Sequence, residues 1–432
     1  MLNQKKIFPI IFLFFLLTAV LSPTLSLEPA AGAIGATSFP KILFYLFDFV
    51  TLFFLFTVTI YFFYRRSVLA LFGNFIKKNI LLILLALSFP LFAVASAFWS
   101  GSPALSLLLG IRLLLIATAV FIAAFFTYRS IKMRSIFIFS LVFLSLVESF
   151  FALIQFLTGQ SLGFTIFGES NLSKDVLGLA RIWIGNELFL RAYGTLPHPN
   201  ILGGFQLFAI VTVAQSYFSR QRLFSKKIYG FIFALQGIGL FLSFSRTAAL
   251  GLFIVILFIF LNKRVGIKEV RKILFFFLVL SALVFSLRGF WGEKFWQGES
   301  FLLRKEMLEA NLERFKSSPF IGRGWGTGPE EISGFSDFPF YFFEKQPVHN
   351  IFVLVLADLG LIGEVIFITI LVLAFLRFSN KKLLSAANLI AFLAIGLFDH
   401  YLLTLPIGIF ILYWSIFGFS EESVPDKKTK KI

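Results

Sequence analysis

Long apolar runs follow one another along nearly the whole chain, separated by short segments of basic and polar residues. Each run has roughly 15 to 25 residues, enough for a helix to cross a hydrocarbon core of about 30 Å. The pattern predicts twelve spans, at 7–27, 42–64, 80–98, 105–127, 135–157, 201–219, 228–243, 247–261, 273–288, 350–376, 384–398 and 402–418. The predicted fold class is therefore an all-α polytopic membrane protein with about 12 transmembrane helices.

Lysine and arginine gather in every second segment between these runs, from Lys5 and Lys6 to the lysine-rich tail. Because these residues collect on the cytoplasmic side of short loops, the alternation predicts that both termini lie in the cytoplasm. The first run resembles a signal peptide in its basic start, but its length favours a retained span. The predicted organisation is N-terminal membrane helices in 1–157, an extracytoplasmic loop in 158–200, membrane helices in 201–288, a large extracytoplasmic loop in 289–349, membrane helices in 350–418 and a basic cytoplasmic tail in 419–432.

The composition agrees with a membrane protein and limits the kinds of partner that we expect. Hydrophobic residues make up 58% of the chain and 64 residues are phenylalanine, which excludes a soluble globular domain. The net charge of +17 is spread over small loop clusters beside the bilayer, so we expect contacts with membrane lipids and no nucleic-acid partner. The chain has no cysteine, which excludes disulfides, thiolate metal sites and a cysteine nucleophile.

The larger predicted loop contains an amphipathic stretch at 301–315. Its apolar residues recur near helical spacing, and Ser317, Ser318 and Pro319 end the pattern. The opposite face is charged and consists of Arg304, Lys305, Glu306, Glu309, Glu313 and Arg314. We expect a helix that lies at the membrane interface or caps the bundle, so this loop is partly helical.

The smaller predicted loop ends in the string RAYGTLPHPN, at 191–200. Pro197 and Pro199 force extended backbone around His198. Arg191, His198 and Asn200 together can hold an anionic group where the chain enters a membrane helix. Interfacial anchoring fits the same residue types, with Arg191 reaching the headgroups and His198 capping the helix.

A charged residue marks the tight turn between two predicted spans, in the string SFSRT at 243–247. Arg246 lies there at the edge of the hydrocarbon, where a charge is expensive and usually faces the bundle interior. Its guanidinium suits bidentate recognition of phosphate. The alternative is an ion pair with a carboxylate, with Asp358, Glu364 and Asp399 as candidates.

A lone histidine opens the span at 350–376. His349 follows the string QPV and lies on the first turn, where an imidazole can act as a general base near neutral pH. A structural role is the alternative for such a histidine. Upstream, the glycine-rich turn at 318–326 carries Arg323 as a third candidate phosphate-facing arginine, and no P-loop string occurs.

The string Asp399-His400-Tyr401 lies at the predicted turn between the last two spans. Asp399 and His400 can help hold an acceptor or the first sugar of a glycan. The alternative is an interfacial polar belt, with Tyr401 at the level of the headgroups.

The order of these strings carries a family resemblance. RAYGTLPHPN precedes a span, SFSRTA lies at a tight turn, the amphipathic helix leads to SPFIGRGWG, and VHNIFVLVLADLGLIG opens a later span. Over roughly residues 180–400 they resemble the O-antigen ligase and polymerase superfamily of bacterial envelope proteins. The first six spans are similar to that family only in hydropathy and number.

The resemblance implies a GT-C-like membrane glycosyltransferase that needs no metal and no cofactor. Such a protein takes a glycan from undecaprenyl diphosphate and joins it to an acceptor hydroxyl on the outer face of the bacterial cytoplasmic (inner) membrane. The acceptor hydroxyl can belong to a glycan, a lipid or a protein, and ligase and polymerase stay equally open. By this resemblance His349 is the catalytic residue, and Arg191 and Arg246 bind the diphosphate. The further candidates for substrate binding are His198, Asn200, Arg304, Arg323, Asp399 and His400.

Two other classes fit the hydropathy. A flippase or transporter for lipid-linked glycans also has many spans, but its charged residues line a path deep in the membrane and its loops are short. A structural scaffold is disfavoured because His198, Arg246 and His349 all lie at helix ends on one predicted side.

Overall fold

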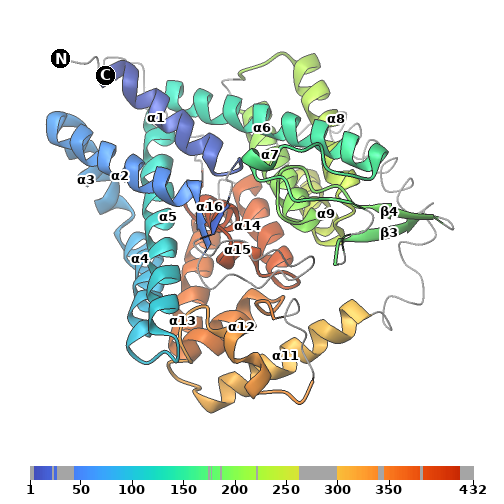
Figure 1. Cartoon of the computed structure of the whole chain (residues 1–432). Coiled ribbons are helices and arrows are strands. Elements are labelled where there is room, and N and C mark those ends of the chain that lie inside the picture. Colours follow the sequence, from blue (N-terminus) through green and yellow to red (C-terminus); the bar gives the residue numbers. More distant parts are fainter. Residues whose placement is uncertain are drawn as a thin grey trace.

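The computed structural model is a bundle of helices with few strands (Figure 1). It describes residues 4–21, 24–26, 43–173, 176, 178–184, 187–219, 222–261, 299–338, 345–379 and 383–418. The predicted span at 273–288 and the basic tail at 419–432 lie outside these residues.

The first part of the chain contributes six helices. They are α1 (Gln4–Thr18), α2 (Leu46–Tyr64), α3 (Arg66–Lys78), α4 (Ile80–Ala95), α5 (Pro103–Arg129) and α6 (Ile131–Thr158). The one that the sequence analysis did not predict is α3, which directly follows α2. Its buried residue is Val68, and its basic residues Lys77 and Lys78 lie in the last turn, where they complement the helix dipole.

The second part contributes nine further α-helices within the described residues. They are α7 (Pro199–Phe218), α8 (Lys226–Leu242), α9 (Arg246–Leu261), α11 (Glu299–Ser317), α12 (Gly328–Glu331), α13 (Ile351–Ser379), α14 (Leu383–Gly396), α15 (Tyr401–Thr404) and α16 (Pro406–Phe417). Nearly every residue of α7 and α16 is buried, so these two helices lie innermost.

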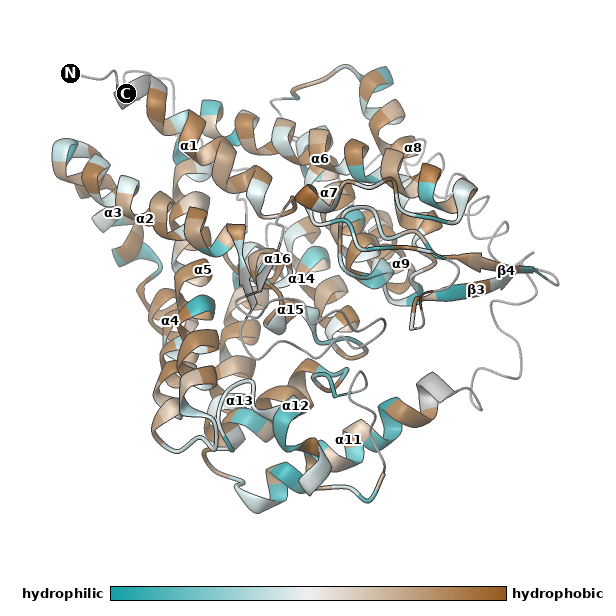
Figure 2. Cartoon of the chain, viewed as in Figure 1, coloured by the Kyte–Doolittle hydropathy of each residue, from teal (hydrophilic) through white to brown (hydrophobic). Residues whose placement is uncertain are grey.

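Six described helices are long and apolar enough to cross a membrane, and four shorter apolar helices accompany them. Side chains on the outside of the bundle agree with a lipid environment, since Phe53, Phe56 and Phe63 of α2 are all more than half exposed. The helical membrane class is thus confirmed, while the count of twelve spans and a GT-C-like fold stay predictions. Figure 2 shows apolar residues over most of the bundle, and hydrophilic ones on α11, α12 and β3.

Two short antiparallel ribbons depart from the all-helical prediction. One pairs β1 (Thr24–Ser26) with β2 (Leu43–Tyr45), and the other pairs β3 (Arg181–Ile184) with β4 (Glu187–Leu190). The second ribbon belongs to the smaller predicted loop. Phe189 of β4 stacks on Phe156 of α6 with ring centroids 5.6 Å apart, which fastens this loop to the end of the long helix.

The helix predicted at 301–315 is confirmed as α11, which lies with α12 at the lower end of the view in Figure 1. Its buried face is only partly the predicted apolar one, since Leu302 is exposed. Its buried stripe is Met307, Ala310, Asn311 and Arg314, at helical spacing. Placing Arg314 on the charged outer face was therefore wrong. Its side chain is fully buried and ion-paired with Asp358 of α13, at 3.1 Å, which offsets the cost of removing a charge from water.

Helix α13 is broken at Gly360, whose φ of 66° and ψ of −167° are not helical. The glycine-rich turn at 318–326 pairs with the backbone groups that the break frees. Gly324 N donates to Asp358 O at 2.9 Å, and Leu361 N donates to Pro319 O at 2.8 Å. A Cβ on Gly360 would lie 2.4 Å from the Phe320 carbonyl carbon, so this approach requires glycine.

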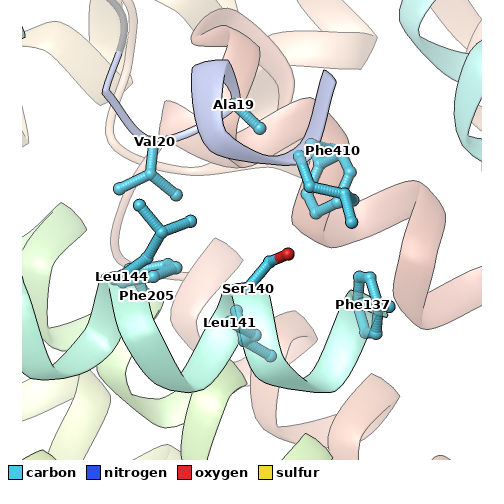
Figure 3. A pocket seen from close by; sticks show the side chains of 9 residues that line it. Ala19, Val20, Phe137, Ser140, Leu141, Leu144, Phe205 and Phe410 are labelled. Carbon is cyan, nitrogen blue, oxygen red and sulfur yellow. The ribbon is translucent and has the colours of Figure 1, made fainter. Parts of the chain in front are cut away.

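A small apolar pocket lies between α1, α6, α7 and α16 (Figure 3). Its lining consists of Leu16, Ala19, Val20, Phe137, Ser140, Leu141, Leu144, Phe205 and Phe410. The one hydroxyl in this lining, that of Ser140, donates to the Ile136 carbonyl of its own helix. The pocket therefore offers shape and apolar contact but no group that could perform a reaction.

Candidate functional site

The start of α7 is brought unusually close to two other segments by a glycine pair. A Cβ on Gly203 would lie 2.7 Å from the Ser245 Cβ, and one on Gly204 would lie 1.9 Å from the Tyr401 hydroxyl. Real Cβ atoms do not tolerate such contacts, so both positions need glycine. The pair lets the beginning of α7 touch the turn before α9 and the beginning of α15.

A chain of hydrogen bonds runs across this junction from Arg191 to Asp399. Arg191 Nε donates to the Ser243 carbonyl at 2.9 Å, and its terminal nitrogen donates to Asn200 Oδ1 at 2.7 Å. Asn200 Nδ2 then donates to Asp399 Oδ2 at 2.9 Å. Arg191 and Asn200 thus join the 191–200 string to Ser243 and to Asp399, which are distant in sequence. The roles predicted for these residues stay predictions.

His349 lies beside the carboxylate at the end of this chain. Its Nδ1 is 3.9 Å from Asp399 Oδ1, and this nitrogen is buried and forms no hydrogen bond within the described part of the chain. Burial first and His400 second lower the pKa of His349 well below its ordinary value of 6.5, although Asp399 raises it. The imidazole is therefore neutral at pH 7 and can accept a proton.

Two further imidazoles surround the same carboxylate. The His400 ring centroid lies 5.1 Å from that of His349, and His400 Nδ1 is 2.7 Å from the Thr404 hydroxyl. His198 is the N-cap of α7, where its Nδ1 accepts from Asn200 N at 3.1 Å. Burial and the charge of Arg191 lower the pKa of His198 to about 3, so this ring is neutral as well.

Asp399 stays ionised in these surroundings. Burial raises the pKa of this carboxyl, but coupling to His349, His400 and His198 and the hydrogen bond from the Asn200 amide lower it to about 2. Because the three imidazoles are neutral at pH 7, the guanidinium groups of Arg191 and Arg304, whose own pKa values Asp399 raises, supply the positive charge that keeps the carboxylate ionised there. A carboxylate 3.9 Å from His349 Nδ1 favours the tautomer that carries its proton on that nitrogen. The lone pair of His349 is then on Nε2.

Arg246 is the first residue of α9, directly after the turn at 243–245. The turn is strained, because Phe244 has a φ of 46°. Local bonds use its hydroxyls: Ser243 Oγ donates to the Leu240 carbonyl at 2.6 Å, and Ser245 Oγ accepts from Ala248 N at 3.3 Å. These hydroxyls thus fix the direction in which Arg246 leaves the turn.

Arg304 comes to the site from α11. Burial lowers the pKa of its guanidinium and Asp399 raises it. In return, the charge of Arg304 lowers the pKa of His349 and of His400, which places the three side chains within electrostatic reach of one another. Burial lowers the pKa of Arg191 to about 10, and the charges of Arg246 and then Arg304 contribute to this shift. Arg246 therefore also lies within electrostatic reach of Arg191, and the guanidinium groups stay cationic at neutral pH.

The site is therefore cationic around one carboxylate and three neutral imidazoles. Its residues are Arg191, His198, Asn200, Arg246, Arg304, His349, Asp399 and His400, from five segments of the chain. Arg323 does not join them. Its Nε forms an ion pair with Glu331 at 2.7 Å, and its guanidinium lies over the Phe335 ring at 4.9 Å.

Three of these residues also have the donor set of a metal site. His349, Asp399 and His400 each offer a ligand atom, and these atoms lie within 4.8 Å of one another. Two imidazoles and a carboxylate suit a divalent transition metal. The guanidinium of Arg304 acts electrostatically on all three, however, and this opposes a further positive charge.

The sequence did not predict the α6 residues that form hydrogen bonds with the backbone of the 191–200 string. Glu148 and Gln155 of α6 accept hydrogen bonds from the backbone of 193–195. The signal available in the sequence was a single carboxylate within an otherwise apolar span, at Glu148.

A comparison with protein families found a match to part of the chain. The family described as O-antigen ligase matches residues 231–368, which contain Arg246, Arg304 and His349. This match confirms the resemblance to the O-antigen ligase and polymerase superfamily. No curated protein matches the chain.

Proposed function

We propose that this protein is a membrane glycosyltransferase of the O-antigen ligase type. It transfers a glycan from undecaprenyl diphosphate to an acceptor hydroxyl on the outer face of the bacterial cytoplasmic membrane. The observation that carries the proposal is the meeting of a neutral imidazole, His349, with the guanidinium groups of Arg191 and Arg304 around one buried carboxylate. A base beside an anion-binding group is what glycosyl transfer from a diphosphate requires.

His349 acts as the general base in this proposal. Nε2 takes the proton of the acceptor hydroxyl while the acceptor oxygen forms a bond to the anomeric carbon. Asp399 is the positioning residue that orients the ring through Nδ1 and stabilises the imidazolium. The separation of 3.9 Å is long for a hydrogen bond, and catalytic contacts of this kind commonly shorten when substrate binds.

The arginines act on the leaving group. The bond between the anomeric carbon and the diphosphate oxygen breaks, and its electron pair leaves with undecaprenyl diphosphate. Arg191, Arg246 and Arg304 bind the diphosphate and stabilise the charge that grows on it. Guanidinium groups provide this stabilisation without a metal, so we propose that the reaction needs neither a metal nor another cofactor.

The remaining polar residues support the same task. Asn200 links Arg191 to Asp399 and thereby sets the distance between the anion-binding side and the base. His198 and His400 face the shared carboxylate, and we place them against the sugar or the acceptor. Arg323 is engaged with Glu331 and has no direct part in the proposed reaction.

In vitro transfer by the purified, reconstituted protein tests the proposal. The donor is an undecaprenyl diphosphate glycan, the acceptors are candidate glycans, lipids and peptides, and parallel reactions contain a chelator. Wild type is compared with His349→Ala, and Lys305→Ala is the matched control, since Lys305 is exposed on α11 and its ion pair is with Glu309, at 3.5 Å on the same helix.

A new glycosidic product that needs His349 and survives chelation supports the proposal. A single addition identifies a ligase, and a ladder of products identifies a polymerase. Movement of the lipid-linked glycan across a proteoliposome membrane without a new glycosidic bond would replace the proposal with a flippase.

A further inference from the structure

One face of α6 carries two buried polar side chains toward the 191–198 segment. Glu148 and Gln155 lie seven residues apart, which is two helical turns, so they point the same way. Both are completely buried. A buried carboxylate inside an apolar helix is expensive, and such residues usually have a task.

Glu148 holds Thr195 by two hydrogen bonds. Thr195 N donates to Oε2 at 2.8 Å, and the Thr195 hydroxyl lies 2.5 Å from Oε1. Among the residues that the structure describes, no lysine, arginine or histidine forms an ion pair with this carboxyl. The threonine is therefore its chief polar partner.

Gln155 completes the hold on the same segment. Its Oε1 accepts from Tyr193 N at 3.0 Å and from Gly194 N at 2.8 Å, and its Nε2 donates to the Gly194 carbonyl at 2.8 Å. Gly194 has a φ of 64°, and a Cβ there would lie 2.0 Å from Glu148 Oε2. The backbone of 193–195 is thus pressed directly against α6 and cannot shift without breaking these bonds.

The held segment connects two residues of the proposed site. Arg191 lies two residues before Tyr193, and His198 lies three residues after Thr195. Arg191 in turn contacts Asn200, so a displacement of 193–195 moves the guanidinium, the imidazole and the amide together. We infer that Glu148 is a positioning residue, which fixes the diphosphate-binding segment through Thr195. This inference rests on the proposed function for the identity of the ligand, but not for the hold itself.

The chemistry of the contact predicts which substitutions preserve it. A glutamine can accept from Thr195 N with its oxygen and donate to the Thr195 hydroxyl with its amide, so Glu148→Gln keeps both bonds. Glu148→Leu removes both and fills similar space. Gln236→Leu is the matched control, because Gln236 is equally buried in α8 and donates to Ser145 Oγ at 2.9 Å, away from the 191–198 segment.

The first arm measures transfer kinetics in the reconstituted full chain, with an undecaprenyl diphosphate glycan as donor. Glu148→Leu should lower kcat/KM for the donor about 10- to 100-fold, as expected when binding groups move by about 1 Å. The acceptor KM should be unchanged. Glu148→Gln should stay within about twofold of wild type, and so should Gln236→Leu, although both leucine variants lose thermal stability.

The second arm needs no activity. Hydrogen–deuterium exchange at Thr195 N should become faster in Glu148→Leu, while Glu148→Gln and Gln236→Leu leave it at the wild-type rate. Unchanged exchange and unchanged donor kinetics in Glu148→Leu would overturn the inference. Equal damage from Gln236→Leu would do the same, since it would reveal a general disturbance of the bundle. A wild-type protein that transfers nothing, yet exchanges as described, would refute the proposed function and leave the positioning role standing.

Discussion

Two groups of arginines, joined by α11, differ in the way that negative charge is distributed around them. Arg314 is fully buried, and it contacts Asp358 at 3.1 Å and Glu331 at 3.3 Å, while Arg323 contacts Glu331 at 2.7 Å. This first group is the paired group. The second, the cationic group, consists of Arg191, Arg246 and Arg304, and Asp399 is the described carboxylate that acts on Arg191 and Arg304.

This difference in charge compensation distinguishes arginines that stabilise the fold from arginines that are available to bind an anion. In the paired group each charge is compensated by the protein itself, so the group joins α11 to the broken α13 and has no need of a ligand. Among the described residues, the positive charge of Arg191 and Arg304 exceeds the negative charge of Asp399 in a largely buried place, and an anion of more than one charge would restore the balance. A diphosphate has that property.

The largest effect on the rate of transfer is expected from substitution of His349, the proposed general base. His349→Ala should lower the rate of transfer about 10²- to 10⁴-fold, the usual contribution of a positioned general base. Thermal unfolding should stay near wild type, since the Nδ1 of His349 forms no hydrogen bond within the described part of the chain. Turnover and melting temperature are measured on the same preparation. Normal turnover by this variant would remove His349 from the mechanism.

The next effect falls on stability and distinguishes the two groups. Arg314→Met leaves Asp358 buried without its cation and should cost about 3–5 kcal/mol of unfolding free energy. Arg304→Met removes one of several like charges and should cost little or even stabilise the protein. Both variants lie on α11, so thermal unfolding in the same detergent compares them directly. Similar losses in both would contradict the distinction.

The third effect falls on donor binding. Arg304→Met and Arg246→Lys should each weaken use of the diphosphate donor about 10- to 100-fold, in line with ~1.5–3 kcal/mol for a hydrogen bond to a charged group. An ammonium cannot reproduce the bidentate fork of a guanidinium. The matched control is Arg323→Lys, in the paired group, whose donor KM should stay near wild type. A fully active Arg246→Lys variant would require another position for the diphosphate.

A smaller effect is expected on the pH profile. His349 must be neutral to accept a proton, and its pKa is lowered well below 6.5, so transfer should persist below pH 6.5 and fail only in more acidic solution. His400 lowers this pKa, whereas Asp399 raises it. His400→Gln should therefore move the acid limb toward neutral pH, by up to about one unit. A shift toward more acidic pH would show that the limb belongs to another group.

The smallest effect is expected from chelation. Because Arg304 acts on each member of the His349, Asp399 and His400 trio, we predict that the trio binds no essential metal. Transfer after dialysis against a strong chelator should equal that of the untreated protein. Loss of activity on chelation, restored by one divalent metal, would turn this trio into a metal centre.

The sequence predicts those parts of the fold that depend only on the length and spacing of apolar segments. The helical membrane class followed from apolar runs, and α11 followed from apolar spacing between Glu299 and Ser317. The burial of Arg314 could not be predicted. Helical spacing shows which residues share a face, but not which residues elsewhere in the fold they contact. The same holds for the break at Gly360, whose freed backbone groups depend on a turn at 318–326.

The candidate site likewise has features that the sequence predicts and features that it does not. Arginines and histidines at the ends of apolar runs could be found from the sequence, since such positions are expensive without a function. The link from Arg191 through Asn200 to Asp399 could not, because it joins α7 to the α14–α15 connection across 199 residues. The partner of Glu148 could not be predicted either, because its bonds to the backbone and hydroxyl of Thr195 join residues 47 positions apart.

The break in α13 also has a consequence for how the chain is made. The part after Gly360, 361–379, forms about 28 Å of helix, which is nearly enough to cross a bilayer alone. The turn at 318–326 that covers the break is synthesised before α13. It has earlier partners, since Trp99 Nε1 donates to the Ile321 carbonyl and Trp325 N donates to Ser96 Oγ, but its bonds to the break form only when α13 arrives. Insertion can therefore begin with the second half of the helix, and the first half, which follows His349, docks afterwards. Assembly of the candidate site is then a late event of biogenesis, completed after the translocon has released the chain into the bilayer.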